Sequence, residues 1–286
     1  MSDPVYRLRL PEVPASSAVF SSPHSGAEYP PSFLARSRLN RLQIRSSEDA
    51  FVDELFASAP GAGAPLLAAR VPRACVDLNR APDELDPALI VGASRRAVNP
   101  RIAAGLGVIP RVVAEGRAII DGKLPLAEAE RRIASFYWPY HRRLRRLIED
   151  QKALFGQAVL FDCHSMPHDA LSSAPSVWGR RPNVILGDRF GASCDRWLIE
   201  AATDAFRLAG FVVARNAPFA GGYITQNYGR PSAGVHALQI EIDRSLYMDE
   251  VRVERLAGFE EIRARLVQVV GELAHLAGPA LPMAAE

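Results

Sequence analysis

The sequence predicts an α/β fold in which helices flank a central β-sheet. Short apolar segments of strand length alternate with longer segments of helical periodicity, and this alternation is typical of α/β layers. Glycine and proline punctuate the segments, without an internal repeat or a low-complexity linker. A chain of 286 residues is long enough to bury one large core. We therefore expect one α/β domain over residues 1–286, with its core between about 15 and 276.

The region before residue 121 combines short strands with one amphipathic helix. Strands are predicted at Ala18–Ser21, Leu66–Val71 and Ala74–Leu78, because each is a short apolar run. Glu48–Ser58 has helical spacing, with its large apolar residues on one face. A further short strand is expected at Ala118–Ile120.

A long helix is expected from Leu126 to Phe155. Its apolar residues recur every three to four positions, as in a helix with one buried face. Pro125 precedes it and Gly156 follows it, and these residue types are favoured at such boundaries. Pro139 lies inside the helix, so we expect a kink or a split there.

The second half of the chain continues the alternation. Its predicted elements are the strands Val159–Asp162, Asn183–Leu186, Phe211–Ala214 and His236–Ile242, and the helices Asp195–Ala209 and Phe259–Leu276. Asn216–Ser232, rich in Gly, Pro, Asn and Tyr, is expected to be an ordered loop. The tail from Ala277 onward is expected to be mobile.

Composition narrows the class of protein. A net charge of +2 argues against a dedicated nucleic-acid binder, and no apolar stretch is long enough for a transmembrane helix. The N-terminus has no apolar signal core, which predicts a cytoplasmic protein. The three cysteines are widely spaced and form no zinc-finger or redox pattern. We therefore expect neither a nucleic-acid nor a membrane partner.

Two histidines stand at the ends of predicted strands. His24 follows the first strand and His164 follows the strand that begins at Val159. Strand ends of α/β proteins meet in a shared crevice, and imidazole is the commonest neutral metal ligand. With carboxylates at Glu48, Asp49 and Glu241, the first hypothesis is a mononuclear zinc hydrolase. A turn histidine and helix-capping carboxylates are the structural alternatives.

The run Asp77-Leu78-Asn79-Arg80 ends another predicted strand. Arginine presents a planar fork that matches a carboxylate, and asparagine adds a donor beside it. Asn79 and Arg80 therefore suit a substrate carboxylate. A surface arginine that caps a turn is the alternative.

Glu241 lies amid strand residues, where a charge needs a partner or a function. If the leucine and isoleucines around it face the core, then Gln239, Glu241 and Asp243 share the opposite face. That face either is exposed or lines a site.

Asp162 and Ser165 are candidate hydrogen-bond partners for His164.

The glycines Gly221 and Gly222 do not belong to a phosphate-binding loop, because no strand-to-helix pattern and no Lys-Ser/Thr accompany them. They are better explained as positions where the backbone approaches a ligand.

Taken together, these segments resemble the N-formylglutamate amidohydrolase (N-formylglutamate deformylase) family. The resemblance covers about residues 18 to 255, and it rests on the order of the motifs rather than on any single one. The motifs are Ser22-Pro23-His24-Ser25-Gly26, Val76-Asp77-Leu78-Asn79-Arg80, Gly107-Val108-Ile109-Pro110-Arg111, Pro139-Tyr140-His141, Asp162-Cys163-His164-Ser165-Met166-Pro167, Asn216-Ala217-Pro218-Phe219-Ala220-Gly221-Gly222-Tyr223 and Gln239-Ile240-Glu241-Ile242.

The resemblance implies a central mixed sheet of eight or a similar number of strands, flanked by helices as in zinc carboxypeptidases and the succinylglutamate desuccinylase/aspartoacylase group. It also implies zinc and the hydrolysis of an N-acyl amino acid: N-formyl-L-glutamate would yield formate and glutamate, the last step of one route of histidine breakdown. The Asp-Leu-Asn-Arg run looks like the carboxylate-binding run of the aspartoacylase group, which assigns Asn79 and Arg80 to the substrate's carboxylate.

One departure concerns the second metal ligand. The carboxypeptidase-type pattern is His-x-x-Glu, but the third residue after His24 is Ala27, and Glu28 follows one position later. Asp49 matches a recurring acidic position of the deformylase family better. We expect Asp49 to be the carboxylate ligand, with Glu48 and Glu28 as substitutes.

The resemblance thus implies a complete set of roles. His24, Asp49 and His164 would hold one zinc ion, Glu241 would take the proton from the attacking water, and Arg111 would stabilise the oxyanion. Gly221, Gly222 and Tyr223 would shape the acyl-side wall.

Three other functions stay open at this point. The same site would suit an N-acyl amino acid deacylase or a carboxypeptidase-like enzyme. A metal-free enzyme would use Cys163 as a thiol nucleophile beside His164. A non-catalytic relative would keep the fold as a small-molecule-binding protein. The sequence alone decides neither the native metal nor the oligomeric state.

Overall fold

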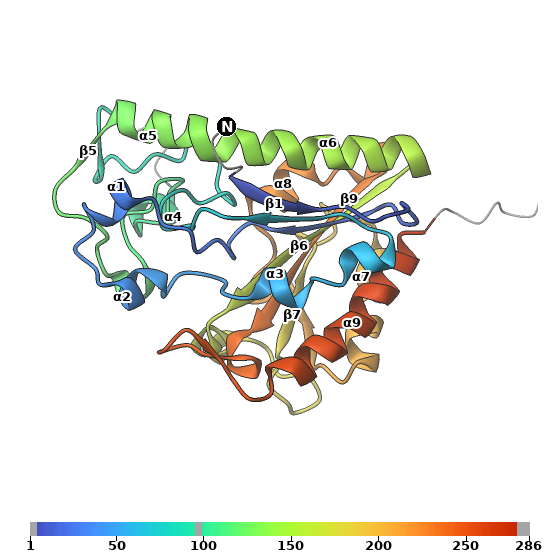
Figure 1. The fold of residues 1–286 in the computed structure, drawn as a ribbon. Coiled ribbons are helices and arrows are strands. Elements are labelled where there is room, and N and C mark those ends of the chain that lie inside the picture. The colour runs from blue at the N-terminus through green and yellow to red at the C-terminus, as the bar shows by residue number, and fades with distance from the viewer. Residues whose placement is uncertain (1–4, 95–98, 279–286) are drawn as a thin grey trace, which may run out of the picture.

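The computed structural model describes residues 5–94 and 99–278. A seven-stranded sheet forms its centre, in the order β1-β3-β2-β6-β9-β7-β8 (Figure 1). The strands are β1 (Tyr6–Arg9), β2 (Ala18–Ser22), β3 (Leu66–Ala69), β6 (Ala158–Met166), β7 (Val184–Gly187), β8 (Val213–Arg215) and β9 (Val235–Asp243). The predicted α/β fold with a central mixed sheet flanked by helices is confirmed, with seven strands in the described chain.

The four strands in the middle run in one direction. β3, β2, β6 and β9 are parallel neighbours, whereas β1 is antiparallel to β3 and β7 is antiparallel to β9. β8 pairs parallel with β7. The carboxyl ends of β2, β6 and β9 therefore meet at the same edge of the sheet, where polar residues follow the buried strands.

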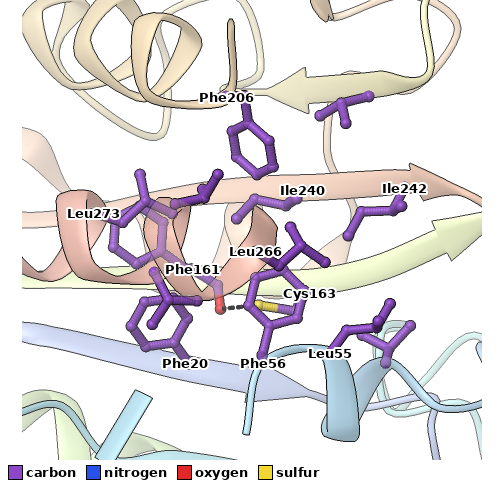
Figure 2. Close-up of a cluster of buried hydrophobic side chains, with 14 of the residues drawn as sticks. Phe20, Leu55, Phe56, Phe161, Cys163, Phe206, Ile240, Ile242, Leu266 and Leu273 are labelled. Carbon is purple, nitrogen blue, oxygen red and sulfur yellow. Dashed lines mark hydrogen bonds between the residues drawn. The ribbon is translucent and has the colours of Figure 1, made fainter. Parts of the chain in front are cut away.

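Helices cover both faces of the sheet (Figure 1). The long helical segment α5 (Leu126–Arg132) to α6 (Trp138–Phe155) crosses one face, and α8 (Tyr223–Tyr228) packs on the same core cluster. The helices α3 (Val52–Leu55), α7 (Arg196–Leu208) and α9 (Phe259–Leu276) pack on the other face. Figure 2 shows this second core, in which Phe20 of β2 stacks on Phe161 of β6 at a ring-centroid distance of 5.1 Å.

The remaining elements are short. They are the helices α1 (Pro31–Leu34), α2 (Arg41–Arg45) and α4 (Pro100–Ala103), and two small ladders that pair β4 (Ile90–Val91) with β5 (Leu124–Pro125) and β10 (Met248–Asp249) with β11 (Glu254–Arg255). No helix in the described part of the chain has the length and apolarity needed to cross a bilayer.

Strand alternation separates the core from the site. In β6, Phe161 and Cys163 point into the cluster beneath α9, whereas Leu160 points toward α6. Asp162 and His164 continue on the α6 side, because side chains alternate along a strand. Beyond Leu160, that face of the strand therefore presents Asp162 and His164, while Phe161 and Cys163 continue the apolar core on the other face.

Several predicted elements differ in the structure. Ala74–Leu78 is a buried turn segment rather than a strand, and its amides bond to loop carbonyls, as Asp77 does to Val108. The predicted helix Glu48–Ser58 is reduced to α3, because Phe51 has a left-handed backbone with φ of 66°. Ala118–Ile120 takes part only in isolated bridges. Asn216–Ser232 contains the helix α8 instead of being loop throughout.

The predicted interruption of the long helix is confirmed. A π-helical segment, Ile133–Tyr137, separates α5 from α6, and Pro139 sits in the first turn of α6, where its missing N–H costs little. Of the predicted mobile tail, residues 279–286 lie outside the described residues, as do 1–4 of the N-terminal segment. One domain over 1–286 stays a prediction.

Candidate active site

The sequence-predicted residues His24, His164 and Glu241 come from three adjacent parallel strands. His24 follows β2 by two residues, and His164 lies directly opposite Glu241 in the β6–β9 register. β6 extends to Met166, so His164 lies inside the strand rather than just after it. The parallel arrangement therefore brings all three side chains to one edge of the sheet.

Asp49 joins them through a backbone contact. Its amide donates to the carbonyl of His24 at 3.0 Å, which fixes the segment after α2 against the turn after β2. That turn needs Gly26, because a Cβ there would overlap the backbone carbonyl of Val71. Asp49 is 1% exposed, so its carboxylate must be satisfied by protein groups or by an ion.

The two imidazoles converge on one carboxylate oxygen. Nδ1 of His164 lies 2.9 Å from Oδ2 of Asp49, and Nδ1 of His24 lies 3.3 Å from the same oxygen. One potential ligand atom from each residue lies within 4.8 Å of the other two, and all three residues are buried. The cluster thus offers two ring nitrogens and one carboxylate oxygen to a common point.

Each imidazole is supported from behind. Nε2 of His24 lies 2.8 Å from Oδ1 of Asp77, and Nε2 of His164 lies 3.0 Å from Oδ2 of Asp162. The predicted partnership between Asp162 and His164 is confirmed. Carboxylate partners of this kind orient a metal-binding histidine and select the tautomer that leaves the other nitrogen free to bind.

The Nδ1 atom of His24 shows that the donor set fits a cation. It is buried and has no hydrogen-bond partner among the described residues, although Asp49 is near. If Nε2 donates to Asp77, the Nδ1 lone pair faces a carboxylate oxygen, and these two acceptors repel unless a cation lies between them. Two imidazole nitrogens and a carboxylate oxygen suit zinc or a similar divalent ion.

Two arginines balance the acidic groups. Arg244 donates from Nη2 to Oδ1 of Asp49 at 2.8 Å and from Nε to Oγ of Ser165 at 3.2 Å. Arg73 donates from Nη2 to Oδ2 of Asp77 at 2.8 Å, and its Nη1 lies 3.7 Å from Oδ1 of Asp49. Asp49 therefore directs one oxygen to the histidines and the other to the arginines.

The electrostatic environment keeps this cluster charged. Burial alone would raise the pKa of Asp49, but the hydrogen bond with His164 and the nearby His24 hold it well below its usual range. Burial alone would lower the pKa of His164, but Asp162 and Asp49 raise it well above its usual value. A divalent cation would replace the proton that the cluster otherwise holds.

Glu241 has the environment of a proton acceptor. Burial raises its pKa to about 7, the negative charge of Asp49 adds to this, and His164 and Arg73 oppose it. Gln239, two residues earlier on the same face of β9, donates to Oε1 of Glu241 at 2.9 Å. The predicted sharing of one strand face by Gln239 and Glu241 is confirmed, since both line the same cavity while Ile240 lies in the core.

A cavity of about 570 Å³ opens above the cluster. Its wall includes the three candidate ligands, Glu241, Arg80 and both predicted glycines. Arg80 donates from Nε to the Leu106 carbonyl at 2.9 Å and from Nη1 to its neighbour's carbonyl, that of Asn79, at 2.8 Å. Its remaining donors are available to a ligand.

Asn79 is committed to the protein rather than to a ligand. Its Oδ1 accepts from the amide of Ile224 at 2.7 Å, and its Nδ2 lies 3.1 Å from Nε2 of His164 and 3.3 Å from Oδ2 of Asp162. A Cβ on Gly222 would lie 2.5 Å from the Asn79 amide group. Asn79 thus connects the first turn of α8 to the histidine cluster, and Gly222 makes room for it.

Four candidate residues lie away from the cluster. Arg111 donates to Asp86 at 2.8 Å and to the Ala103 carbonyl at 3.2 Å, and it does not line the cavity. Tyr223 lies behind the wall, with its ring 5.9 Å from that of His141. Glu28 pairs with Arg70 near the surface, and Glu48 accepts from Tyr29 and Arg45. The two substitute carboxylates therefore do not reach the histidines.

Cys163 points away from the cavity. It lies in the core on the opposite face of β6 from His164, and burial raises the pKa of its thiol well above the usual value. A thiolate nucleophile at this position has no access to a substrate in the cavity.

Sequence reasoning missed Asp77, Arg73 and Arg244 as parts of the site. Asp77 was noticed only as the start of the Asn79-Arg80 run. Arg73 and Arg244 adjoin acidic positions in sequence, at four residues before Asp77 and one residue after Asp243. That spacing is common in ordinary surface ion pairs, so it carries little information by itself.

A parallel strand edge that gathers two carboxylate-supported histidines, an aspartate and a buried glutamate under an open cavity defines an α/β enzyme of the hydrolase class, with a site that could hold one metal ion. The profile of the N-formylglutamate amidohydrolase family matches residues 16–248, most of the chain. The chain belongs to this family.

Individual relatives agree with that assignment. N-formylglutamate deformylase from Pseudomonas aeruginosa is 34% identical over 238 residues, covering 81% of this chain and 82% of the relative. The enzyme of the same name from Pseudomonas putida is 33% identical over 237 residues, with the same coverage. The crystal structure of N-formylglutamate amidohydrolase from Ralstonia eutropha JMP134 superposes with a TM-score of 0.89 at 35% identity, covering 96% of this chain and 98% of that one.

Proposed function

We propose that this protein is a zinc-dependent deformylase that hydrolyses N-formyl-L-glutamate to formate and L-glutamate. The observation that carries the proposal is the convergence of His24, Asp49 and His164 on one point beneath a cavity, in a chain whose relatives carry that activity in their names. These three residues would hold the ion. When bound, the ion would supply Lewis-acid activation of water and of the formyl carbonyl.

Glu241 acts as the general base. It borders the cavity next to His164, and a carboxylate whose pKa is raised toward neutrality accepts a proton from water effectively. The proton is then available for the amine that leaves as glutamate. The burial of Glu241 disfavours a permanent charge, so proton transfer to it is supported by the surrounding structure.

Arg73 is the donor best placed to stabilise the developing oxyanion. Its guanidinium lines the cavity and lies beside Asp49 and Asp77, which hold it in position. The sequence-based choice for this role, Arg111, is committed to Asp86 outside the cavity wall. A fixed cation near the reacting carbonyl lowers the energy of the transition state without reorganisation.

Arg80 binds a carboxylate of the substrate. Two of its nitrogens are fixed by backbone carbonyls, so the guanidinium is oriented before a ligand arrives. Asn79 contributes by donating to Asp162, the partner of His164, and by accepting from the first turn of α8, not by contacting the substrate. Gly221 and Gly222 also line the cavity, and a side chain there would fill the space next to Thr225 or Asn79.

The decisive experiment measures hydrolysis of N-formyl-L-glutamate by the purified protein before chelation, after chelation and after zinc is restored. Activity that disappears on chelation and returns with zinc supports the substrate and the metal together. Bound zinc without activity on this substrate would favour the N-acyl amino acid deacylase alternative, which a panel of N-acetyl and N-succinyl amino acids tests directly.

A further inference from the structure

The charged side chains around the cavity fall into a paired inner group and a less paired outer group. Arg73 and Arg244 both hydrogen-bond carboxylates of the cluster. Glu115 at the rim pairs with Arg117. The two other arginines of the cavity wall, Arg80 and Arg101, make no hydrogen bond or ion pair with a carboxylate in the described chain.

Arg80 and Arg101 are tied to the same loop residue. Arg80 donates from Nε to the carbonyl of Leu106, and the amide of Leu106 donates to the backbone carbonyl of Arg101 at 2.9 Å. Arg101 lies in α4, whose N-cap residue is Asn99. The two guanidinium groups therefore face one cavity from neighbouring backbone positions.

The two positive charges act on each other. Burial lowers the pKa of Arg80, and the charges of Arg73 and Arg101 lower it further, while Asp77 and Glu84 oppose the shift. Two neighbouring cations that lack a shared anion repel each other, and an anionic ligand between them removes the repulsion. The part of the cavity lined by Arg80 and Arg101 is thus complementary to a ligand with more than one negative charge.

We infer that Arg101 recognises the side-chain carboxylate of the substrate while Arg80 binds the α-carboxylate, so that the site selects N-acyl amino acids with two carboxylates. This inference rests on the proposed function and names a residue and a substrate class for it. The α-carboxylate is one carbon from the scissile nitrogen, so it must bind near the catalytic cluster, where Arg80 adjoins Asn79. The side-chain carboxylate extends further and reaches the exposed Arg101.

The test compares N-formyl-L-glutamate with N-formyl-L-glutamine, which has the same shape without the side-chain charge. For the wild-type protein, kcat/KM should be about 10- to 100-fold higher for the glutamate derivative, as expected for a charge-assisted hydrogen bond. Arg101→Gln should remove most of this difference by lowering kcat/KM for N-formyl-L-glutamate alone, mainly through KM. Arg101→Lys should restore part of it.

Two further variants make the result specific. Arg80→Gln should lower kcat/KM for both substrates, because both carry the α-carboxylate. Arg142→Gln removes an exposed arginine on α6, outside the cavity wall, and should change neither value. A preference for N-formyl-L-glutamate that survives in Arg101→Gln would overturn the role of Arg101. An equal loss of kcat/KM on both substrates would overturn it as well. A wild-type protein that hydrolyses neither substrate would overturn the proposed function and this inference with it.

Discussion

His164 and Glu241 lie directly opposite each other on the adjacent parallel strands β6 and β9. One of these residues belongs to the candidate metal cluster and the other is the candidate base, so the sheet itself sets their separation. Neither side chain depends on a mobile loop for its position.

Replacing Glu241 with Gln should reduce kcat by about 100-fold or more, because the side chain keeps its shape but no longer accepts a proton. KM and metal content should change little, since neither depends on the basicity of this group. Steady-state kinetics with metal analysis of the same sample checks both parts. Near-normal kcat in a metal-loaded variant would exclude Glu241 as the base.

Asp77→Asn should weaken zinc binding by about 10- to 100-fold, because the carboxylate that supports Nε2 of His24 is replaced by a neutral amide. Titration of the metal-free protein with zinc and a competing chelator measures the effect. Glu28→Gln is the matched control, since Glu28 pairs with Arg70 away from the cluster. Equal affinities of the two variants would show that Asp77 does not support the site.

Gly222→Ala should lower both stability and activity, unlike the same substitution at a glycine with open space around it. The new methyl group would lie 2.5 Å from the amide of Asn79, which would have to give up its hydrogen bond with Asp162 or with Ile224. We expect a loss of about 1–3 kcal/mol in unfolding free energy together with lower kcat/KM. Denaturant unfolding and kinetics on the same preparation measure both.

The control for that substitution is Gly271→Ala in α9. Nothing lies within 4 Å of the added methyl group, and alanine favours a helix by about 0.5–1 kcal/mol. This variant should be slightly more stable and fully active. If both alanine variants behaved alike, the close approach of Gly222 to Asn79 would carry no functional weight.

His141 should make the protein less stable in acid. Burial lowers its pKa from the ordinary value to about 4, so the folded state keeps the ring neutral. The unfolded chain takes up the proton first, near pH 6.5, and stability is therefore lost as pH falls from about 6.5 toward 4. The shift corresponds to about 3 kcal/mol over that interval.

The measurement must isolate the contribution of His141 from that of the rest of the chain. The unfolding free energy of the wild type minus that of His141→Gln should be largest above pH 6.5 and should shrink as the solution is acidified. The ring is neutral because it is buried, and its neighbours, the Leu78 carbonyl 2.9 Å from Nε2 and the Tyr228 hydroxyl 2.9 Å from Nδ1, carry no negative charge that would offset this burial. A difference that does not depend on pH would contradict a neutral buried His141.

The sequence was most informative where local periodicity decides orientation. A short apolar strand followed by a polar residue located His24 and His164 at one sheet edge, and alternation around Ile240 put Glu241 on the face opposite the core. These patterns depend on neighbours within a few positions, so one sequence is enough to recognise them.

The rest of the site depends on contacts between distant segments. Arg73 and Asp77 lie in a turn segment whose residues are as apolar as those of a buried strand. The strand predicted at Ala74–Leu78 is therefore wrong. Arg244 donates to Asp49, which lies 195 positions earlier in the chain. Arg111 carries the same charge as Arg73, but in the structure it pairs with Asp86, whereas Arg73 pairs with Asp77 beside the histidines. The sequence does not show which of these carboxylates each arginine meets.

The strand order also limits when the site can form during synthesis. β2 lies next to β6, and β6 next to β9, although long segments separate them in the chain. A nascent chain that has not yet produced β6 lacks His164, and one that stops before β9 lacks Glu241 and Arg244. The three candidate metal ligands are therefore complete once β6 has emerged, whereas the candidate base comes only with β9, so a nascent chain carries the ligands for the ion before it carries the base.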